Sequence, residues 1–202
     1  MGLFDFFKRK ANRYEKADQV EYETAYFDIN EDFIENNDMY AIIEPLWWAV
    51  NYYDGEETYE RDMEQFTLEQ RYIFAIALYT AEVNNGGHDQ FYFNSSGIVW
   101  EDAMRGFEAV GLKKNYEIIK ESAERLGGYP SKNRFERQDQ LEQYEPDFDD
   151  LDSRFYRSEE DEEFEAALSR YIRANKEKWT SVNRLDTWNR ENYATQSYIC
   201  SH

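Results

Sequence analysis

Residues 84–97 form the densest group of side chains with special backbone or hydrogen-bonding chemistry in this sequence. The notable positions are Asn85, Gly86, Gly87, Gln90, Phe91, Asn94 and Gly97. Amides and glycines offer recognition but no acid, base or nucleophile. We interpret the segment as architectural: the glycines turn the chain, Gln90 and Asn94 satisfy buried backbone groups, and Phe91 and Phe93 anchor a helical hairpin. The alternative is an enzyme or small-ligand binder with a pocket near Asn85, Gln90 and Asn94, which an apolar cavity at this place would favour.

The residues needed for a catalytic or metal centre are sparse. The histidines are His88 and His202, and the one cysteine is Cys200, so too few donors are present to converge on a transition metal. His88 has no Gly-x-Ser-x-Gly context, and the sequence has no glycine-rich loop with a lysine to hold a phosphate. We therefore expect no enzyme activity, no metal and no cofactor.

Carboxylates, by contrast, are abundant and concentrated in two blocks. Residues 15–69 contain 17 acidic and 2 basic side chains and residues 139–165 contain 13 and 2, whereas residues 71–137 are neutral overall. Such blocks repel nucleic acid and anionic lipid and attract basic surfaces. The candidate partner-binding residues are Glu56, Glu57, Asp147, Asp149, Asp150, Asp152, Glu159, Glu160, Asp161, Glu162 and Glu163.

The acidic run 147–152 is similar to part of a calcium-binding loop, but two positions contradict a calcium site. Asp152 stands where an EF-hand needs glycine, and Ser158 stands at the last ligand position. We therefore expect residues 145–152 to form a solvated loop or a short turn.

Helical periodicity dominates the elements that must position these residues. A capping-box pattern at 67–70 and the apolar run to Val83 predict a central buried helix, which Gly86 and Gly87 end. Further helices are expected over 38–53, 88–94, 98–110, 113–126, 130–144 and 159–178, the first of them kinked or split by Pro45. Strand signals are few, so the sequence predicts an all-α fold.

The expected architecture is a single compact multi-helix domain with helical extensions at both ends. We assign residues 1–37 to an N-terminal extension, 38–130 to the core domain that carries the motif, and 131–202 to an acidic helical C-terminal extension packed on the core. The 202 residues include 17 Tyr, 14 Phe and 5 Trp, which can bury much apolar area.

The composition also bears on the cellular compartment. The net charge is −20, and a single cysteine cannot form an intrachain disulfide. No stretch is long and apolar enough to span a bilayer, and residues 1–10 place an apolar patch ahead of a basic cluster, the reverse of a secretory signal. We therefore expect a cytoplasmic protein with no membrane span.

The string Asn-Gly-Gly…Gln-Phe…Asn…Gly within 84–97, followed by Ala103, Phe107, Gly111 and the expected helix 113–126, resembles the bacterial DNA-mimic proteins. The similarity covers about residues 38–130. It implies an all-α fold and a protein that presents carboxylates in a duplex-like array to occupy the DNA-binding face of a transcriptional repressor. Duplex DNA carries about one phosphate per 1.7 Å of axis, and the two acidic blocks are dense enough to be compatible with such an array. The motif itself lies in the neutral centre of the sequence and cannot be the mimic surface.

We therefore predict a non-enzymatic acidic protein that binds a basic, DNA-binding protein rather than nucleic acid. The alternative from another class is an immunity or antitoxin-like inhibitor that covers the substrate groove of a basic nuclease toxin. The oligomeric state stays open, a homodimer included. The mimic hypothesis requires the two acidic blocks to share an exposed surface with few positive groups between them.

Overall fold

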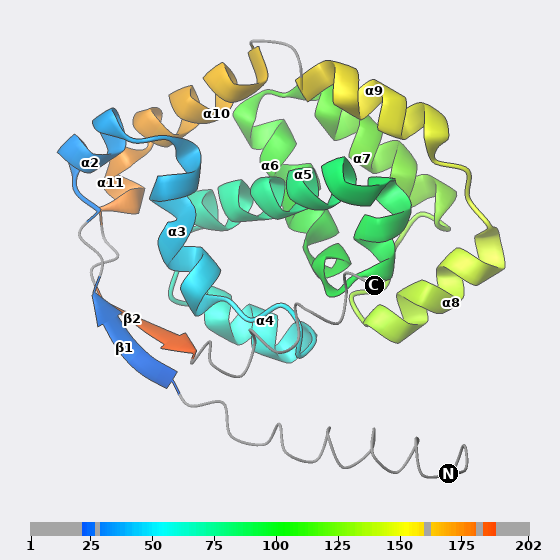
Figure 1. Cartoon of the computed structure of the whole chain (residues 1–202), viewed down its shortest axis with the longest axis horizontal. Helices are drawn as coiled ribbons and strands as arrows, with labels where there is room; N and C mark the ends of the chain where they lie inside the picture. The colour runs from blue at the N-terminus through cyan, green and yellow to red at the C-terminus, as the bar shows by residue number, and fades with distance from the viewer. Residues whose placement is uncertain (1–21, 27–28, 160–162, 181–183, 189–202) are drawn as a thin grey trace.

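Helices make up most of the structure (Figure 1). The computed structural model describes residues 22–26, 29–159, 163–180 and 184–188 of the chain. In chain order the elements are β1 (Tyr22–Tyr26), α2 (Glu31–Asn36), α3 (Met39–Ala49), α4 (Glu56–Met63), α5 (Leu68–Phe93), η1 (Ser95–Val99), α6 (Trp100–Val110), α7 (Lys113–Arg125), α8 (Arg134–Tyr144), α9 (Asp149–Glu159), α10 (Glu163–Ala174), α11 (Lys176–Trp179) and β2 (Arg184–Trp188). The predicted all-α fold is confirmed, with one pair of short strands added in the described part of the chain.

Helix α5 is the centre of the packing. Thr67 begins it with the predicted capping box, in which its hydroxyl accepts a hydrogen bond from the Gln70 backbone and the Gln70 side chain accepts one from the Thr67 backbone. The turns from Ile73 to Tyr79 are buried on every side. Helices α3, α6, α8 and α9 and the 3-10 turn η1 all pack against α5, so the core surrounds this helix.

The chain changes direction within α5 at Gly86 and Gly87, where the sequence predicted that the buried helix ends. Gly87 has φ +72°, a conformation that strains any residue with a Cβ. A Cβ at Gly87 would also collide with the carboxylate of Asp152 on α9. The two glycines therefore serve both the turn and the close approach of α9.

Residues 145–152 correct one prediction, because from Asp149 onward they form the first turn of α9 rather than a loop or a short turn. The Asp147 side chain accepts a hydrogen bond from the Asp149 backbone at 3.0 Å, and the Asp152 backbone donates to the Phe148 carbonyl at 2.9 Å. Carboxylates are favoured in the first turn of a helix because they face its positive end. An acidic run can therefore begin a helix.

Two other helix predictions differ from the structure. The single helix expected over 159–178 is wrong, because α9 already ends at Glu159 and Asn175 separates α10 from α11. The helix expected over 38–53 is shorter and is not split by Pro45, since α3 runs through this residue with Ile42 and Leu46 buried on either side of it. Tertiary packing here outweighs the local preference of proline.

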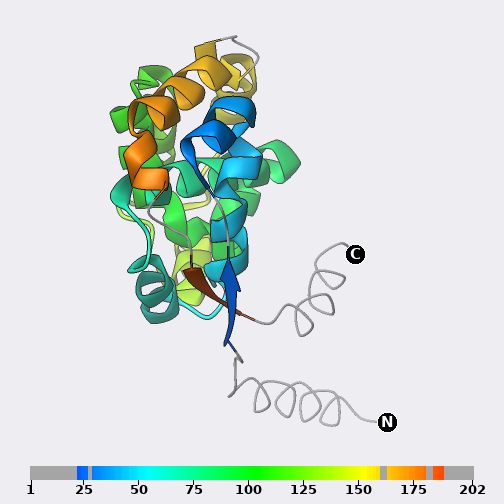
Figure 2. The same ribbon diagram turned by 90° about the vertical axis from the view of Figure 1, so that its left-hand side faces the viewer.

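Strands β1 and β2, which the sequence did not predict, pair antiparallel and join the two ends of the described chain. Tyr22 lies opposite Trp188, and Tyr26 lies opposite Arg184. Figures 1 and 2 show this ribbon at the edge of the helical body beyond α3, and β2 contacts α3. Neither strand alternates strictly between apolar and polar residues, since Glu23 and Thr24 are adjacent in β1 and Asp186 and Thr187 are adjacent in β2.

Helix α8 is anchored at the corner between α5 and η1 by the fully buried Arg137. Its guanidinium donates to the carbonyl oxygens of Tyr92 at 2.7 Å and Asn94 at 2.6 Å. Burial lowers the pKa of Arg137 to about 10, so the group stays charged at neutral pH. Gly97 leaves room for it, since a Cβ there would lie 2.5 Å from Nε of Arg137. The segment expected to be a C-terminal extension thus shares buried contacts with the motif, and the division of the chain into three segments stays a prediction.

Candidate partner-binding surface

The predicted partner-binding carboxylates fall at two separate ends of the molecule. Glu56 and Glu57 begin α4, whereas the later residues lie between the start of α9 and the start of α10. In Figures 1 and 2 helix α4 lies at the opposite end of the helical body from the junction of α9 and α10. The structure therefore does not bring the two predicted groups together, and residues 160–162 lie outside the described part of the chain.

Several of the predicted carboxylates are already engaged inside the chain. The observed pairs are Glu56 with Lys132, Asp150 with Arg125, Glu163 with Arg170, and Asp152 with the imidazole of His88. A nearby cation cancels much of the electrostatic field that a carboxylate exerts on a distant partner protein. This is true even where the ion pair itself contributes little to stability. Glu56, Asp150 and Glu163 are consequently less available to a partner than their number in the sequence indicates, and Asp152 is occupied by two hydrogen bonds from His88.

One cluster of engaged carboxylates joins α4 to α5 and to the segment before α8. We call Glu60, Arg71, Asp102 and Lys132 the first paired cluster. Arg71 contacts Glu60 at 2.7 Å and Asp102 at 2.8 Å, and Lys132 contacts Glu60 at 3.1 Å. Hydrogen bonds from Arg71, and then from Lys132, lower the pKa of Glu60 to about 2. The negative charge of Glu60 is therefore neutralised by cations of the same chain.

A second paired cluster lies between α7 and α9 and consists of Glu121, Arg125, Asp150 and Arg154. Arg154 contacts Glu121 at 2.6 Å, and Arg125 contacts both Glu121 and Asp150 at 2.5 Å. Hydrogen bonds from Arg154 and Arg125 lower the pKa of Glu121. This cluster holds α9 on α7 and leaves little net charge, although Asp150 was a predicted partner-binding residue.

The carboxylate of Asp89, just after the break in α5, has the opposite surroundings. Its pKa is raised, first by burial and then by the negative charge of Asp152, with Asp149 and Asp147 adding to the effect. A raised carboxyl pKa means that the ionised form is disfavoured by the surrounding protein. The start of α9 and the turn of α5 thus bring several carboxylates together, although His88 acts on the pKa of Asp89 in the opposite direction and Arg125 donates to the Asp147 carbonyl at 2.6 Å.

A similar group lies at the other end of α9. The pKa of Glu165 on α10 is raised by burial and then by Glu159 and by Asp38, which precedes α3. The same three carboxylates raise the pKa of Tyr40, after burial. Residues from three elements therefore gather negative charge around one place on the surface.

The two anionic groups are joined through α5. The side chain of Asn84 donates to Glu159 at 2.6 Å, and the hydroxyl of Tyr156 donates to the carbonyl oxygen of Val83 at 3.0 Å. We call the exposed or half-exposed carboxylates along this path the anionic ridge: Asp38, Asp89, Asp147, Asp149, Glu159 and Glu165. Helix α9, about 16 Å long, sets the span between its two groups.

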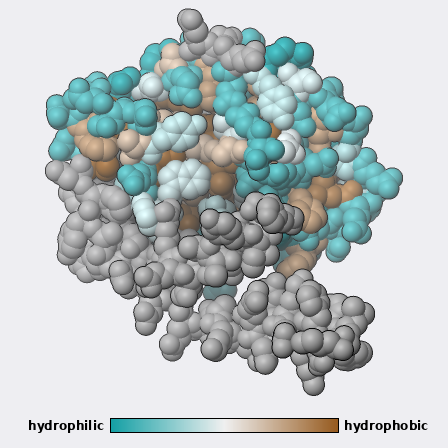
Figure 3. All heavy atoms as spheres, viewed as in Figure 1, coloured by the Kyte–Doolittle hydropathy of each residue, from teal (hydrophilic) through white to brown (hydrophobic). Residues whose placement is uncertain are grey.

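Positive groups of α9 lie on another side of the helix. Arg154 and Arg157 line a hollow towards α7, together with Lys113, Lys114 and Ile118. On the face shown in Figure 3, hydrophilic residues dominate the region over α9, while hydrophobic residues gather nearer the middle of the face. Asp150 lies on the same side of α9 as Arg154, 3.9 Å from it, whereas Asp152 and Glu159 contact α5 instead.

A groove of about 850 Å³ lies between the second half of α5 and α8. It is lined by Glu82, Asn85, Asp89, Gln90, Phe93, Asn94, Arg134, Leu141 and Glu142. The amides of Gln90 and Asn94 donate to the same oxygen of Glu82, at 2.9 and 3.0 Å. These amides therefore position a carboxylate, and do not satisfy buried backbone groups as the sequence analysis expected.

Four carboxylates of this surface and groove are not among the predicted site residues: Glu82, Asp89, Asp38 and Glu165. Glu82 lies on the other side of the α5 break from its two amide partners, so helical spacing cannot relate them. Asp38 and Glu165 are far apart in sequence and meet only because α10 packs against α2 and α3. Asp89 was a member of the motif segment and could have been found by asking which of its residues carry charge.

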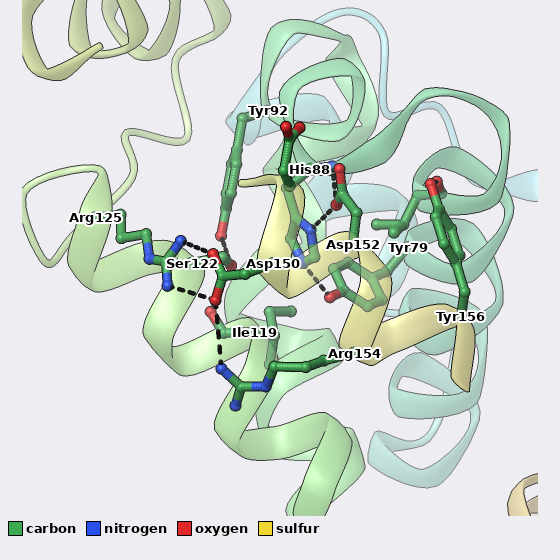
Figure 4. A network of polar contacts seen from close by, with 12 residues as sticks. Tyr79, His88, Tyr92, Ile119, Ser122, Arg125, Asp150, Asp152, Arg154 and Tyr156 are labelled. Carbon is green, nitrogen blue, oxygen red and sulfur yellow. Dashed lines mark hydrogen bonds and ion pairs between the residues drawn. The ribbon is translucent and has the colours of Figure 1, made fainter. Parts of the chain in front are cut away.

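His88, the one imidazole in the described part of the chain, is fully buried and bonded at both ring nitrogens (Figure 4). Nδ1 and the backbone N–H of His88 both donate to Oδ1 of Asp152, and the Tyr79 hydroxyl lies 2.7 Å from Nε2. Burial raises the pKa of Tyr79 well above its usual range, so this hydroxyl stays protonated. The rings of His88 and Tyr79 are fully buried, and the network ties α9 to the turn of α5.

Membrane spans and metal sites can be assessed for residues 22–26, 29–159, 163–180 and 184–188. No helix among them is both long and apolar enough to cross a membrane. No group of three or more histidine, cysteine, aspartate or glutamate side chains among them could hold a metal ion.

The model of the DMP19-like protein family matches residues 64–175. The matched region starts later than the expected residues 38–130 and continues through α8, α9 and α10. Arg137 and Asp152 tie α8 and α9 to α5. No protein with curated annotation and no solved structure matches the chain.

Proposed function

Because this chain belongs to the DMP19-like family, that of DNA mimic protein 19, we propose that it is a non-enzymatic DNA mimic that occupies the DNA-binding surface of a basic partner protein. A cytoplasmic transcriptional regulator is the kind of partner we expect. The observation that supports this function best is the anionic ridge along α9. There Asp38 from the first acidic block lies close enough to Glu159 and Glu165 from the second for their charges to interact, and neighbouring carboxylates help to raise the pKa of Glu165 and of Asp89.

Electrostatics favours the ridge over the other acidic residues. The raised pKa values of Asp89 and Glu165 arise first from burial and then from repulsion by neighbouring carboxylates, and perturbed pKa values are enriched at functional sites. Arginines and lysines of a partner would relieve that repulsion on binding. Asp147, Asp149 and Glu159 are the predicted partner-binding residues that belong to this surface in our proposal, whereas Glu160, Asp161 and Glu162 lie outside the described part of the chain.

The remaining predicted residues take a smaller role in the proposal. Glu56, Asp150 and Glu163 are ion-paired, and Asp152 closes the break in α5. Glu57 lies with Glu56 on α4, away from the ridge. We assign to these residues at most a contribution to the overall negative field, which steers a basic protein towards the chain.

The experiment that tests mimicry is competition with DNA. The full chain is immobilised and exposed at low salt to a lysate of the native cell, and the retained proteins are then challenged with short duplex DNA or with a neutral polymer. We expect DNA to release the specific partner and the neutral polymer to retain it, because the ridge and the duplex would bind the same surface.

Rising salt should release the same partner, since exposed charges are screened. Retention that neither duplex DNA nor salt reverses would contradict the mimic function. If the released partner is a nuclease that the chain inhibits, the protein acts as an immunity protein instead.

A further inference from the structure

The groove between α5 and α8 adds a binding feature that the ridge does not include. It lies beside Asp89, one end of the ridge, and it combines charged and apolar walls. The inference below rests on the proposed function, because it concerns how the same partner is held.

One wall of the groove is an oriented carboxylate. The side-chain amides of Gln90 and Asn94 both donate to Oε2 of Glu82, which fixes the plane of this carboxylate. Asp89 and Glu142 line the same groove. Three carboxylates therefore face one resident cation, Arg134, so the groove is complementary to a further positive charge.

The other wall is apolar and exposed. Phe93 is 53% exposed, and Leu141 lines the groove next to it. The guanidinium carbon of Arg134 lies 5.8 Å from the centre of the Phe93 ring, and its Nε donates to the Phe93 carbonyl at 3.1 Å. The chain itself thus shows that a guanidinium packs against this ring.

We propose that the groove receives an arginine side chain of the partner. Arginine fits both walls, because its planar guanidinium stacks on an aromatic face while its N–H groups bind carboxylates in a forked geometry. Lysine carries the same charge but is more strongly hydrated and cannot donate as a planar fork. DNA-binding surfaces are rich in arginines that contact phosphate, so the partner class supplies the ligand.

The test compares an oligoarginine and an oligolysine peptide of equal length and equal label, titrated into the full chain at one salt concentration. Fluorescence anisotropy gives both affinities. We expect the wild-type chain to bind the arginine peptide several-fold more tightly. In nuclear magnetic resonance spectra the side-chain amide signals of Gln90 and Asn94 should shift with the arginine peptide more than with the lysine peptide.

The matched variants are Phe93→Ala and Phe135→Ala. Both remove an exposed phenyl ring near the same helix pair, but Phe135, 75% exposed, does not line the groove. We expect Phe93→Ala to weaken arginine-peptide binding about fivefold and to remove the preference over lysine, in the range of an exposed cation–π contact. Phe135→Ala should leave both affinities unchanged.

A second matched pair tests the charged wall: Glu82→Gln within the groove and Glu108→Gln on α6, an exposed position outside it. Glu82→Gln should lower arginine-peptide affinity several-fold more than Glu108→Gln. Thermal melts show whether each variant is folded. If Glu82→Gln is destabilised, the comparison of Phe93→Ala with Phe135→Ala still tests the groove.

The outcomes separate this inference from the proposed function. Equal binding of the two peptides, or equal effects of Phe93→Ala and Phe135→Ala, would overturn the arginine groove and leave the ridge in place. Absence of binding by either peptide at low salt would overturn both.

Discussion

The anionic ridge and the two paired clusters contain the same residue types in opposite surroundings. In the clusters, arginine and lysine hydrogen bonds lower the pKa of Glu60 and Glu121. On the ridge, burial and neighbouring carboxylates raise the pKa of Asp89 and Glu165. In a chain with net charge −20, the number of carboxylates therefore does not say where negative charge is available to a partner.

The largest effect is expected from neutralising the ridge. The triple variant Asp89→Asn, Glu159→Gln, Glu165→Gln should lower the affinity for an oligolysine peptide about tenfold, since each exposed charge contributes about 0.5 kcal/mol. Fluorescence anisotropy at low salt measures this change.

A triple variant in engaged carboxylates is the control for this experiment: Glu56→Gln, Asp150→Asn, Glu163→Gln. It changes the net charge by the same amount, but its carboxylates are already paired, so its affinity should fall much less. Equal losses of peptide affinity in the two triple variants would show that only the net charge matters. The ridge carboxylates would then be no more important for binding than the paired ones.

The second prediction concerns stability. Glu60→Gln removes a carboxylate that holds Arg71 and Lys132, and Arg71 is only 18% exposed. We expect a loss of about 1–2 kcal/mol in the free energy of unfolding, because the partly buried guanidinium loses a charged acceptor. Urea denaturation measures it.

Glu57→Gln on the same helix is the matched control and should stay within about 0.5 kcal/mol of the wild type. Peptide affinity should hardly change in the Glu60 variant. A Glu60 variant as stable as the wild type would mean that the first paired cluster does not stabilise the fold.

The smallest effect is a difference in the sign of the pH dependence. Glu60 has a folded-state pKa of about 2, below its unfolded value of about 4.3, so its stabilisation is present above that value and is lost as the pH falls towards 2. Asp89 and Glu165 have raised pKa values, so their contribution is present at low pH and is lost as the pH rises through the folded-state values.

The double variant Asp89→Asn, Glu165→Gln should therefore be slightly more stable than the wild type at pH 7, with the gain disappearing below about pH 4. Thermal melts across this pH range measure the difference. A double variant that is less stable at pH 7 would contradict the interpretation of the ridge as a place of uncompensated repulsion.

Much of the helical framework follows from local signals in the sequence. The capping box at Thr67, the break at Gly86 and Gly87, and the left-handed glycine at Gly111 are fixed by nearest neighbours, and the sequence predicted each helix end that they mark. The start of α9 was missed because acidic residues can either cap a helix or remain solvated, and local sequence does not separate the two.

The candidate surface was predictable only in part. The high density of acidic residues around α9 was visible in the sequence. The ion pairs of Arg125 with Asp150 and of Lys132 with Glu56, however, depend on packing between distant segments. The contact of His88 with Asp152 spans 64 positions and has no local signal. Pairing decides which carboxylates remain available, and pairing is a property of the tertiary structure.

The carboxylate of Asp152 comes from the helix that carries much of the ridge, yet its hydrogen bond ends on the backbone of the second half of α5. Helix α9 therefore cannot lift from the body without releasing the amide of His88 to solvent. A displacement of α9 at the surface would therefore act directly on α5, the central helix. Protection of the His88 amide against hydrogen–deuterium exchange would accordingly report whether the ridge is occupied, from a position that no ligand touches.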